Sequence, residues 1–361
     1  MRKSFVIILL ILSLLLILSC GKKAEQTDQE KLKVGFVYIG PIGDAGWTYA
    51  HEQGHQALKQ LPFVEKTTIV ENVPENAEAT RVITQLAEEG YNLIFTTSFG
   101  YSDPTIEVAA KYPNVKFMHC SGYKTADNVG TYFGKMYEAT YLAGVAVGKL
   151  TKSNKVGIVA AHPIPEVKRH INGYARGIAS VNPNAKLYVI WANSWYDPGK
   201  ESDAANSLID MGCDVIMQNM DSAAAQQAAE KRGVLSVGYN NDMSKFAPRA
   251  HITAPIWNWS VVYKYIAEQV YNKTWTNEQI YWGLDKDLIG LAPFNASVPE
   301  DIKTYVEQKK QEIVAGTLHP FAGPVKDNTG ALRVKEGETM TDEALLSIDW
   351  LVENVVDKSQ K

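Results

Sequence analysis

Residues 34–54 read VGFVYIGPIGDAGWTYAHEQG, and this stretch decides the fold class. It starts with a β-rich apolar run that predicts a buried strand over 34–39. A loop rich in Gly and Pro follows, and the residues from Trp47 to Leu61 have the pattern of a helix. Because a strand that leads through a short loop into a helix is the unit of a parallel sheet, we expect an α/β fold.

The same alternation continues along the chain and then starts again. In the first half we expect strands at 67–73, 92–98, 115–121 and 128–133, with helices at 76–89, 104–111 and 137–149. After a polar break at 151–154, we expect strands at 155–161, 185–192, 214–219 and 234–240, with helices at 166–180, 200–211 and 223–232. The sequence therefore predicts two doubly wound parallel-sheet units of about the size of one domain each.

The segments after residue 250 are more than the second unit needs. They predict a strand at 251–256, a helix at 259–271, a strand and a helix from Ile280 onward, and a final helix near 342–356. We infer that the chain crosses between two lobes more than once, which makes a multi-strand hinge beside a cleft. The predicted division is 33–150 plus about 253–275 for lobe 1, 151–252 plus about 276–330 for lobe 2, and a segment at 331–361 that packs near the hinge.

The N-terminus has the features of an export signal. The run from Ser4 to Ser19 carries no charge, follows Arg2 and Lys3, and is shorter than a bilayer-spanning helix. Its end, Ile-Leu-Ser-Cys20, resembles the bacterial lipobox, in which the Cys becomes the lipid-modified first residue. We expect a lipoprotein signal peptide at 1–19, a lipid anchor on Cys20 and a flexible tether at 20–32. A plain secretory signal and an uncleaved anchor are the alternatives.

Charge and motif content exclude several function classes. The chain has 36 Lys and Arg against 40 Asp and Glu, so it lacks the positive field that draws proteins to nucleic acid. Cys120 and Cys213 have no spacing typical of a zinc site or a disulfide, and we expect both to be small buried side chains. His51 and His55 are four residues apart, but a solvated helix face is expected there in place of a metal site. No cofactor is expected, and the protein is expected to be a monomer.

Ligands in open α/β sheets bind outside the carboxyl ends of the strands, so the residues after each strand are the candidates for a site. Trp47 and Trp195 follow strands at equivalent places in the two halves. Two indoles that face each other across a cleft would clamp a flat heterocycle, although either would also serve in a core. Phe99 and Tyr101 follow another strand and are predicted to line the pocket, with packing between lobes as the alternative for Phe99.

Five segments carry a family resemblance that covers about residues 33–356. They are Gly43–Trp47 with Gly54, Glu138–Gly144, Asn193–Pro198, Gly238–Asp242 and Ile348–Val352. Together they resemble the basic membrane protein (BMP) family of substrate-binding lipoproteins, which includes purine nucleoside receptors of ABC transporters. The resemblance implies a type I periplasmic-binding-protein fold in which two aromatic side chains sandwich the purine, and it places them at Trp47 and Trp195.

Three features depart from the nucleoside-binding members of that family. Those members typically have Asp-x-Ser-Phe-Asn in the first loop and Gly-Val-Asp-x-Asp in a later loop, with carboxylates available to ribose hydroxyls. Here the first loop reads DAGWT at 44–48, Asn240 stands where one carboxylate would be, and Trp257 lies near a position that is often Lys. Added bulk and a lost charge leave less room for a sugar, so we expect a purine base, adenine first. A purine nucleoside is the alternative ligand.

Polar contacts to the purine are predicted from Asp221, Asn240 and Asp242. An amide donates and accepts at once, which suits the adjacent amino group and ring nitrogen of adenine, and a carboxylate accepts from an N–H. Asp221 would serve equally as the N-cap of the next helix, and Asp242 as the cap of a turn. Glu138 begins a helix with a small-residue face at 143–148, where close packing near the hinge is expected instead of ligand contact.

The predicted function follows from these features. No G-x-S-x-G motif is present and no Cys has a base in motif context, so an enzyme is not expected. We expect a lipid-anchored receptor outside the cytoplasm that passes a purine to an ABC permease. A ligand-sensing lipoprotein that is not coupled to transport is the alternative, because a fold and a pocket do not prove transport.

Overall fold

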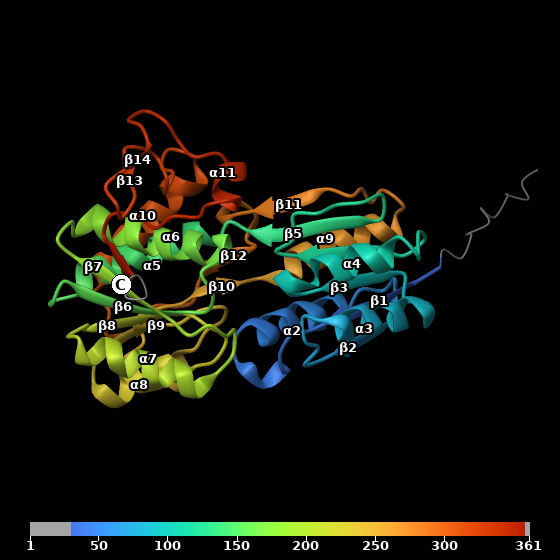
Figure 1. The fold of residues 1–361 in the computed structure, drawn as a ribbon, viewed down its shortest axis with the longest axis horizontal. Helices are drawn as coiled ribbons and strands as arrows, with labels where there is room; N and C mark the ends of the chain where they lie inside the picture. Colours follow the sequence, from blue (N-terminus) through green and yellow to red (C-terminus); the bar gives the residue numbers. More distant parts are fainter. Residues whose placement is uncertain (1–29, 358–361) are drawn as a thin grey trace, which may run out of the picture. The chain divides into compact units, whose positions relative to one another are not determined.

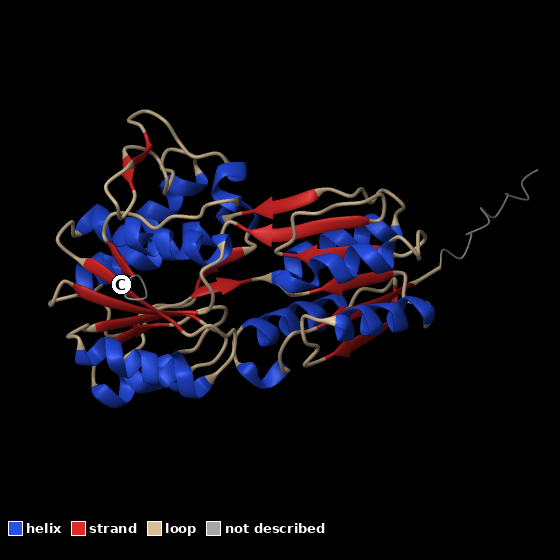
Figure 2. Ribbon diagram, in the orientation of Figure 1, coloured by secondary structure: helices blue, strands red, loops and turns tan. Residues whose placement is uncertain are grey.

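Two all-parallel sheets organise residues 30–357, which are the residues that this computed structural model describes (Figures 1 and 2). Sheet A has the order β11-β5-β4-β3-β1-β2, and sheet B has the order β15-β7-β6-β8-β9. The strands of sheet A are β1 (Leu32–Val37), β2 (Val64–Val70), β3 (Leu93–Thr96), β4 (Lys116–Cys120), β5 (Val129–Gly134) and β11 (Gln279–Trp282). Those of sheet B are β6 (Lys155–Ala160), β7 (Lys186–Trp191), β8 (Val215–Asn219), β9 (Leu235–Val237) and β15 (Val355–Asp357). The expected α/β fold with parallel sheets is confirmed.

Helices cover both faces of sheet A. On one face, α3 (Ala77–Glu88) and α4 (Ser102–Ala109) pack over a core that includes Val37. On the other face, α2 (Trp47–Leu58) and α9 (Trp259–Tyr271) enclose a core that includes Phe36. Because successive residues of a strand point to opposite faces, the neighbours Phe36 and Val37 belong to different cores.

Sheet B is covered in the same way, by α7 (Pro198–Asp210) and α8 (Ala224–Arg232) on one face and by α5 (Met136–Leu150) and α6 (Pro165–Val181) on the other. The pair α5 and α6 is in unusually close contact. A Cβ atom added to Gly144 would lie 2.3 Å from the carbonyl oxygen of Tyr174, and one added to Gly177 would lie 2.0 Å from that of Tyr141. The small-residue face at 143–148 therefore packs closely, as predicted. Cys120 and Cys213 are both buried, also as predicted, and form no disulfide.

The chain passes between the two sheets more than once. The short strand β10 (Pro255–Trp257) pairs antiparallel with β12 (Ile289–Leu291), and Figure 1 shows this pair between the two sheets. Between them the chain returns to sheet A, where β11 pairs with β5. The prediction that residues 276–330 belong to the second lobe is therefore wrong for this strand. Pairing with β11 covers the edge of β5, which would otherwise expose a row of unpaired backbone groups.

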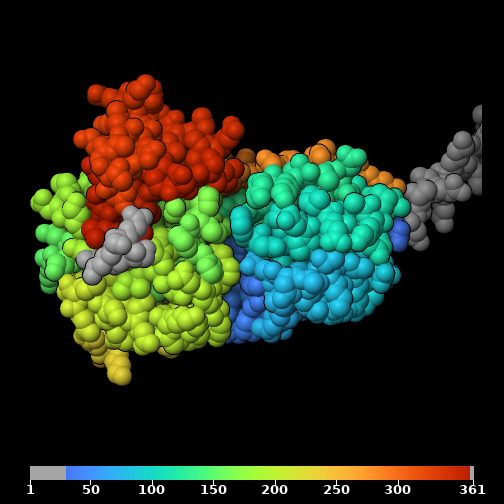
Figure 3. Space-filling model, in the orientation of Figure 1, coloured from blue at the N-terminus to red at the C-terminus, as the bar shows by residue number. Residues whose placement is uncertain are grey.

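The C-terminal segment packs on the second half of the molecule. It contains α10 (Glu300–Val314), β13 (Val325–Lys326), β14 (Leu332–Val334) and α11 (Asp342–Leu346) before β15 joins sheet B beside β7. Figure 3 shows these residues, in red, gathered on one side of the green and yellow residues.

The final helix predicted near 342–356 begins at Asp342 as expected, but the predicted end is wrong, because the helix stops at Leu346. Beyond it, the amide of Asn172 donates to the carbonyl oxygen of Trp350 and accepts from the N–H of Val352. Asn172 lies on α6, so a distant helix supplies the hydrogen bonds that a continued helix would have made.

Among residues 30–357, no helix has both the length and the apolar character that crossing a membrane requires. The predicted signal peptide at 1–19 and Cys20 lie outside the described residues. Strand β1 begins at Leu32, so the last residue of the predicted tether already belongs to sheet A.

Candidate ligand-binding site

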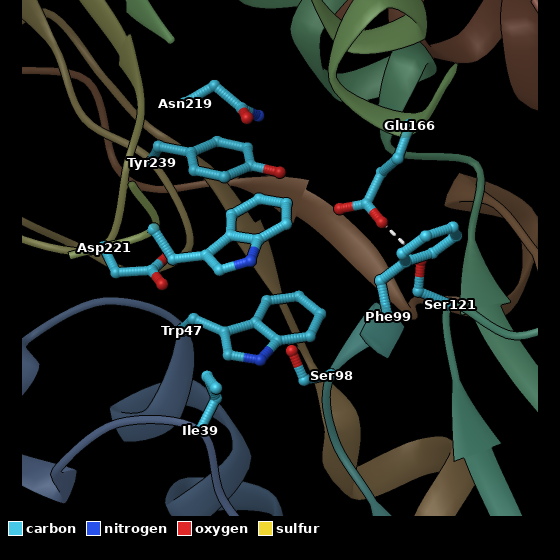
Figure 4. Close-up of a pocket in the computed structure, with 10 residues that line it drawn as sticks. Ile39, Trp47, Ser98, Phe99, Ser121, Glu166, Asn219, Asp221 and Tyr239 are labelled. Atoms are coloured by element: carbon cyan, nitrogen blue, oxygen red, sulfur yellow. Dashed lines mark hydrogen bonds between the residues drawn. The ribbon is translucent and has the colours of Figure 1, made fainter. Parts of the chain in front are cut away.

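A cavity with about 400 Å³ of empty space, part of it open to solvent, lies between the two halves of the molecule, at the carboxyl ends of strands from both sheets (Figure 4). Each lining residue ends a parallel strand, lies in the segment that follows one, or lies in the first turn of the next helix, as expected for open α/β sheets. The lining residues are Ile39, Trp47, Ser98, Phe99, Ser121, Glu166, Trp195, Asn219, Asp221 and Tyr239.

Trp47 is fixed in place by contacts behind the cavity. It is the first residue of α2, and its indole N–H donates to the carbonyl oxygen of Thr97 over 2.7 Å. The rings of His51, Trp257 and Trp259 meet it edge to face at centroid distances of 4.4, 5.7 and 5.5 Å. The ring is therefore both a core side chain and a cavity wall, which unites the two roles that the sequence left open for it.

Trp195 is held more loosely than Trp47. It lies in the loop between β7 and α7, is half-buried, and meets the ring of His162 edge to face at 5.0 Å. Its carbonyl oxygen accepts from the backbone N–H of Asp221 over 3.1 Å, which ties two cavity loops together. Both predicted clamp residues thus line one cavity, and their stacking on a base stays a prediction.

Asp221 presents a buried carboxyl group to the cavity. The side chain is 7% exposed, and one oxygen accepts from the amide of Asn240 over 2.9 Å. Burial raises the pKa of this carboxyl well above its usual range, and the nearby carboxyls of Asp44 and Glu201 add to the shift. The alternative role as a helix N-cap is not what the structure shows, because Ser222 accepts the backbone N–H of Ala224 at the start of α8.

Asn240 and Trp257 lie behind the cavity wall and not on it. Asn240 is fully buried, donates its amide N–H to Asp221, and accepts the indole N–H of Trp257 over 2.9 Å. Trp257 is 4% exposed and stacks on Trp259 at 4.5 Å. In this structure, therefore, neither side chain reaches the cavity as predicted. The reason is that residue 240 has a positive φ of 68°, and its side chain is held between Asp221 and Trp257.

The remaining predicted residues divide between cavity, core and surface. Phe99 lines the cavity and is 36% exposed. Tyr101 is fully buried, and its hydroxyl donates to the carbonyl oxygen of Val73, so the prediction that it lines this cavity is wrong. Asp242 is exposed and accepts the backbone N–H of Ser244 over 2.9 Å, which is the turn-capping role that the sequence left open.

Glu166 is the most informative lining residue that the sequence reading missed. It lies in the first turn of α6, where its carboxyl accepts a hydrogen bond from the hydroxyl of Ser121 (Figure 4). Burial raises the pKa of this carboxyl above its usual value. The signal was present, because Glu166 follows the predicted strand at 155–161 just as Trp47 follows the first strand.

Two further missed residues share one buried partner. The hydroxyl of Tyr239 lies 3.0 Å from Nδ1 of His170, and the amide nitrogen of Asn219 lies 3.2 Å from the same atom. His170 is fully buried, and burial holds its pKa well below its usual range. Nδ1 of the neutral imidazole accepts both hydrogen bonds. It therefore fixes the positions of Asn219 and Tyr239 in the cavity wall.

The loop before α2 touches the opposite half of the molecule. Asp44 accepts the backbone N–H groups of Gly46, Thr48 and Tyr49 over 2.8 to 3.0 Å and so caps the helix that Trp47 begins. A Cβ atom added to Gly46 would lie 2.1 Å from the carbonyl oxygen of Asp221. Only a glycine allows this approach of the two loops across the cavity.

The histidine pair on α2 is not a solvated face, so that expectation is wrong. His51 is fully buried with Nδ1 2.6 Å from the hydroxyl of Tyr263, and His55 is 5% exposed between Glu52 and Thr67. Helix α2 is covered by α9 on this side, which a pattern of polar residues does not reveal. Within residues 30–357, no group of three or more His, Cys, Asp and Glu side chains is placed to hold a metal ion.

Comparison with known proteins gives a family match and two relatives that are named for different ligands. The model of the Bmp family, described as "ABC transporter substrate-binding protein PnrA-like", matches residues 31–319. A purine-binding protein of Brucella abortus (strain 2308) is 46% identical over 331 residues, which cover 91% of this chain and 94% of that protein. A protein of Haloferax volcanii, whose name describes a glucose-binding protein of an ABC transporter, is 40% identical over 298 residues, or 82% of this chain and 76% of its own.

Among solved structures, a solute-binding protein of an ABC transporter system from Conexibacter woesei superimposes with a TM-score of 0.67. The match is 24% identical and covers 80% of this chain and 98% of that chain. At this sequence identity, the match is evidence for a shared fold.

Proposed function

The chain belongs to the Bmp family of PnrA-like ABC transporter substrate-binding proteins, and we propose that its ligand is a purine base, adenine first. As a member of this family it is a solute receptor that works outside the cytoplasm, and not an enzyme. The observation that carries the proposal is the pairing of two indoles, Trp47 and Trp195, with buried carboxyls on the wall of a single cavity. The relative in Brucella abortus, which is named as purine-binding, supports the same ligand class.

The cavity has the groups that a purine base needs. Stacking of one base on an aromatic side chain contributes about 1–3 kcal/mol, and two indoles line this cavity. Asp221 and Glu166 are side-chain groups that accept N–H donors such as the exocyclic amino group of adenine, and Asn219 and Tyr239 add a donor and a hydroxyl. A flat, apolar-faced ligand with polar edges matches this arrangement.

The preference for a base over a nucleoside rests on Asn240. Where nucleoside-binding members typically carry a carboxylate, Asn240 already donates to Asp221 and accepts from Trp257. Its carbonyl oxygen is thus engaged and buried, so ribose hydroxyls would find no carboxylate at this position. A sugar in the cavity would leave its hydroxyls without this partner, and each unpaired polar group costs about 1–3 kcal/mol.

Titration calorimetry with adenine, guanine, hypoxanthine, adenosine and inosine tests the proposal. We expect adenine to bind at least about tenfold more tightly than adenosine, a difference of about 1.4 kcal/mol. Tighter binding of adenosine or inosine would replace the base by a nucleoside and leave the purine receptor standing. D-glucose belongs in the panel because of the relative in Haloferax volcanii, and binding of glucose without any purine would contradict the purine proposal.

We also propose that the protein is anchored by lipid on Cys20 and delivers its ligand to an ABC permease. The support is the lipobox-like end of the N-terminal apolar run, Ile-Leu-Ser-Cys20. Only the Cys thiol forms the thioether to the lipid, so Cys20→Ser is expected to abolish incorporation of a labelled fatty acid and to release the protein from membranes. Labelled, membrane-bound Cys20→Ser protein would contradict the anchor. A sensor kinase gene beside this one, in place of permease and ATPase genes, would favour sensing over transport.

A further inference from the structure

A second and larger cavity adjoins the purine cavity. It has about 990 Å³ of empty space, part of it open to solvent, and shares three wall residues with the first, namely Phe99, Ser121 and Glu166. Its other walls come from both halves of the molecule, with Tyr132, Phe133, Ile280 and Tyr281 on the side of sheet A and Arg169 and Leu346 on the side of sheet B. The proposed function uses none of these six residues.

Arg169 is the unusual group in this cavity. It lies on α6 with 2% of its surface exposed, and one guanidinium nitrogen donates to the carbonyl oxygen of Leu345 over 3.0 Å. Its Nε has no hydrogen-bond partner. Among the residues that the structure describes, no carboxylate lies within 4.0 Å of this guanidinium. Glu166, one turn earlier on α6 and on the wall of the same cavity, interacts electrostatically with Arg169, but burial raises the pKa of that carboxyl. A buried cation that has no close ion pair is costly, and buried cations are normally paired.

The surroundings of Arg169 define the chemistry of a group that it could bind. The guanidinium lies 5.9 Å from the ring centroids of both Phe133 and Tyr281. The hydroxyl of Tyr281 is buried and has no hydrogen-bond partner either. One cation and one unpaired hydroxyl between aromatic walls suit a planar anion on an apolar body, since a guanidinium binds a carboxylate through two parallel hydrogen bonds.

We propose that the second cavity is a binding subsite for an apolar or aromatic group that carries a carboxylate, which is bound by Arg169 and Tyr281. The group is either a substituent of the purine or a separate small molecule. The first form rests on the proposed purine site, and the second does not. Because the cavity has walls on both halves of the molecule, an occupant contacts both and favours the arrangement in which the two halves are close together.

Calorimetry with two probes tests the subsite and separates the two sources. Phenylacetate represents the separate molecule, and adenine that carries a 4-carboxybenzyl group on its amino nitrogen represents the substituted purine. We expect at least one probe to bind and to lose at least about tenfold in affinity in Arg169→Gln, because the charged hydrogen bonds are lost. Phenylacetamide, which has the same shape without the charge, is expected to bind at least about fivefold more weakly than phenylacetate if the separate molecule is the occupant.

Two further variants keep the test decisive. Lys168→Gln is the matched control, because Lys168 precedes Arg169 on α6 and also donates to a backbone carbonyl of the C-terminal segment, at Asp349, but does not line the cavity. Tyr281→Phe removes only the unpaired hydroxyl and serves if Arg169→Gln does not fold. Failure of both probes to bind protein that still binds adenine would overturn the subsite alone, and equal affinities in wild type, Arg169→Gln and Tyr281→Phe would do the same. If the wild-type protein did not bind adenine, that result would count against the proposed function instead.

Discussion

The carboxyl group of Asp221 both lines the cavity and is held in a fixed orientation. Its carboxyl lines the cavity, and one oxygen is oriented by the amide of Asn240. Burial raises its pKa, so the empty closed site favours the protonated acid. A ligand N–H stabilises the ionised form instead, so binding of a base that donates to Asp221 releases a proton over the pH range in which the empty site is protonated.

The first prediction concerns this carboxyl. In Asp221→Asn, the new side chain still accepts from Asn240 through its oxygen and turns an N–H toward the cavity. We expect adenine to bind about tenfold more weakly, because its donor then meets a donor. In the wild type we expect affinity to rise as the pH increases toward the raised pKa and to level off above it, and calorimetry in several buffers measures this.

Asp242→Asn is the matched control, because Asp242 also follows a strand of sheet B, β9, but is exposed and caps a turn at Ser244. Its affinity and pH profile are expected to follow the wild type. A pH dependence that persists unchanged in Asp221→Asn would assign the titrating group to another residue, with Glu166 as the next candidate.

At the scale of residues, the sequence predicted which residues lie near the cavity better than it predicted where their side chains point. The rule that ligands bind after parallel strands pointed to Trp47, Trp195, Phe99 and Asp221, which line the cavity. It failed for Tyr101, whose hydroxyl bonds to the carbonyl of Val73 in the core. A position after a strand sets where a Cα lies, but the direction of the side chain depends on neighbours that are distant in sequence.

At the scale of elements, Glu138 shows how a helix start is tied to the crossing segments. It lies in the first turn of α5, and its carboxyl accepts the backbone N–H of Leu284 over 2.9 Å. A Cβ atom added to Gly283 would lie 2.4 Å from the same carboxyl. Glu138 lines neither cavity, so the expected structural role near the hinge agrees with where it lies.

Burial raises the pKa of Glu138 from 4.5 to about 7, which gives the second prediction. Below pH 4.5 the group is protonated in both the folded and unfolded states and has no effect. As the pH rises toward 7, only the unfolded state ionises, so the free energy of unfolding decreases. Glu138→Gln cannot ionise, so we expect it to match the wild type near pH 5 and to be about 1–3 kcal/mol more stable near pH 8 in urea unfolding.

Glu300→Gln is the control for this pH effect, since Glu300 also begins a helix but is exposed. Its stability is expected to stay within about 0.5 kcal/mol of the wild type at both pH values. If Glu138→Gln were less stable than the wild type at pH 8, the ionised carboxylate would be the favourable partner of Leu284, and the direction inferred here would be wrong.

Local pattern predicted the elements well where each strand and helix packs against its chain neighbours. The helix at 259–271 was predicted with the observed ends, and the strands of both sheets up to residue 240 were found within a few residues. After residue 275 the strand and the helix expected from Ile280 onward are present as β11 and α10, but the return of β11 to sheet A was not predicted. The last helix was predicted too long, because the segment after α11 takes its hydrogen bonds from Asn172. The structure of these segments depends on partners that are distant in sequence, and the local hydrophobic pattern carries no information about those partners.

At the scale of the whole molecule, the two halves meet where the loop before α2 contacts the segment after β8. Gly46 belongs to the half with sheet A and Asp221 to the half with sheet B. The space for a Cβ atom at Gly46 is taken by the carbonyl of Asp221, at 2.1 Å, so this contact exists only when the halves are close together. The structure therefore corresponds to a closed arrangement, and rotation about the crossing segments would separate these two residues.

Gly46→Ala is expected to fold normally and to be unable to close. A methyl group 2.1 Å from a backbone oxygen forces the loops apart, but it meets nothing once the halves have separated. We expect adenine to bind at least about tenfold more weakly, because the two indoles no longer reach the ligand together. Small-angle scattering should show that saturating adenine reduces the radius of gyration of the wild type and not of Gly46→Ala.

Gly43→Ala is the control, because a Cβ atom there has nothing within 4 Å. Equal compaction in Gly46→Ala and wild type would mean that closure does not require the Gly46 contact.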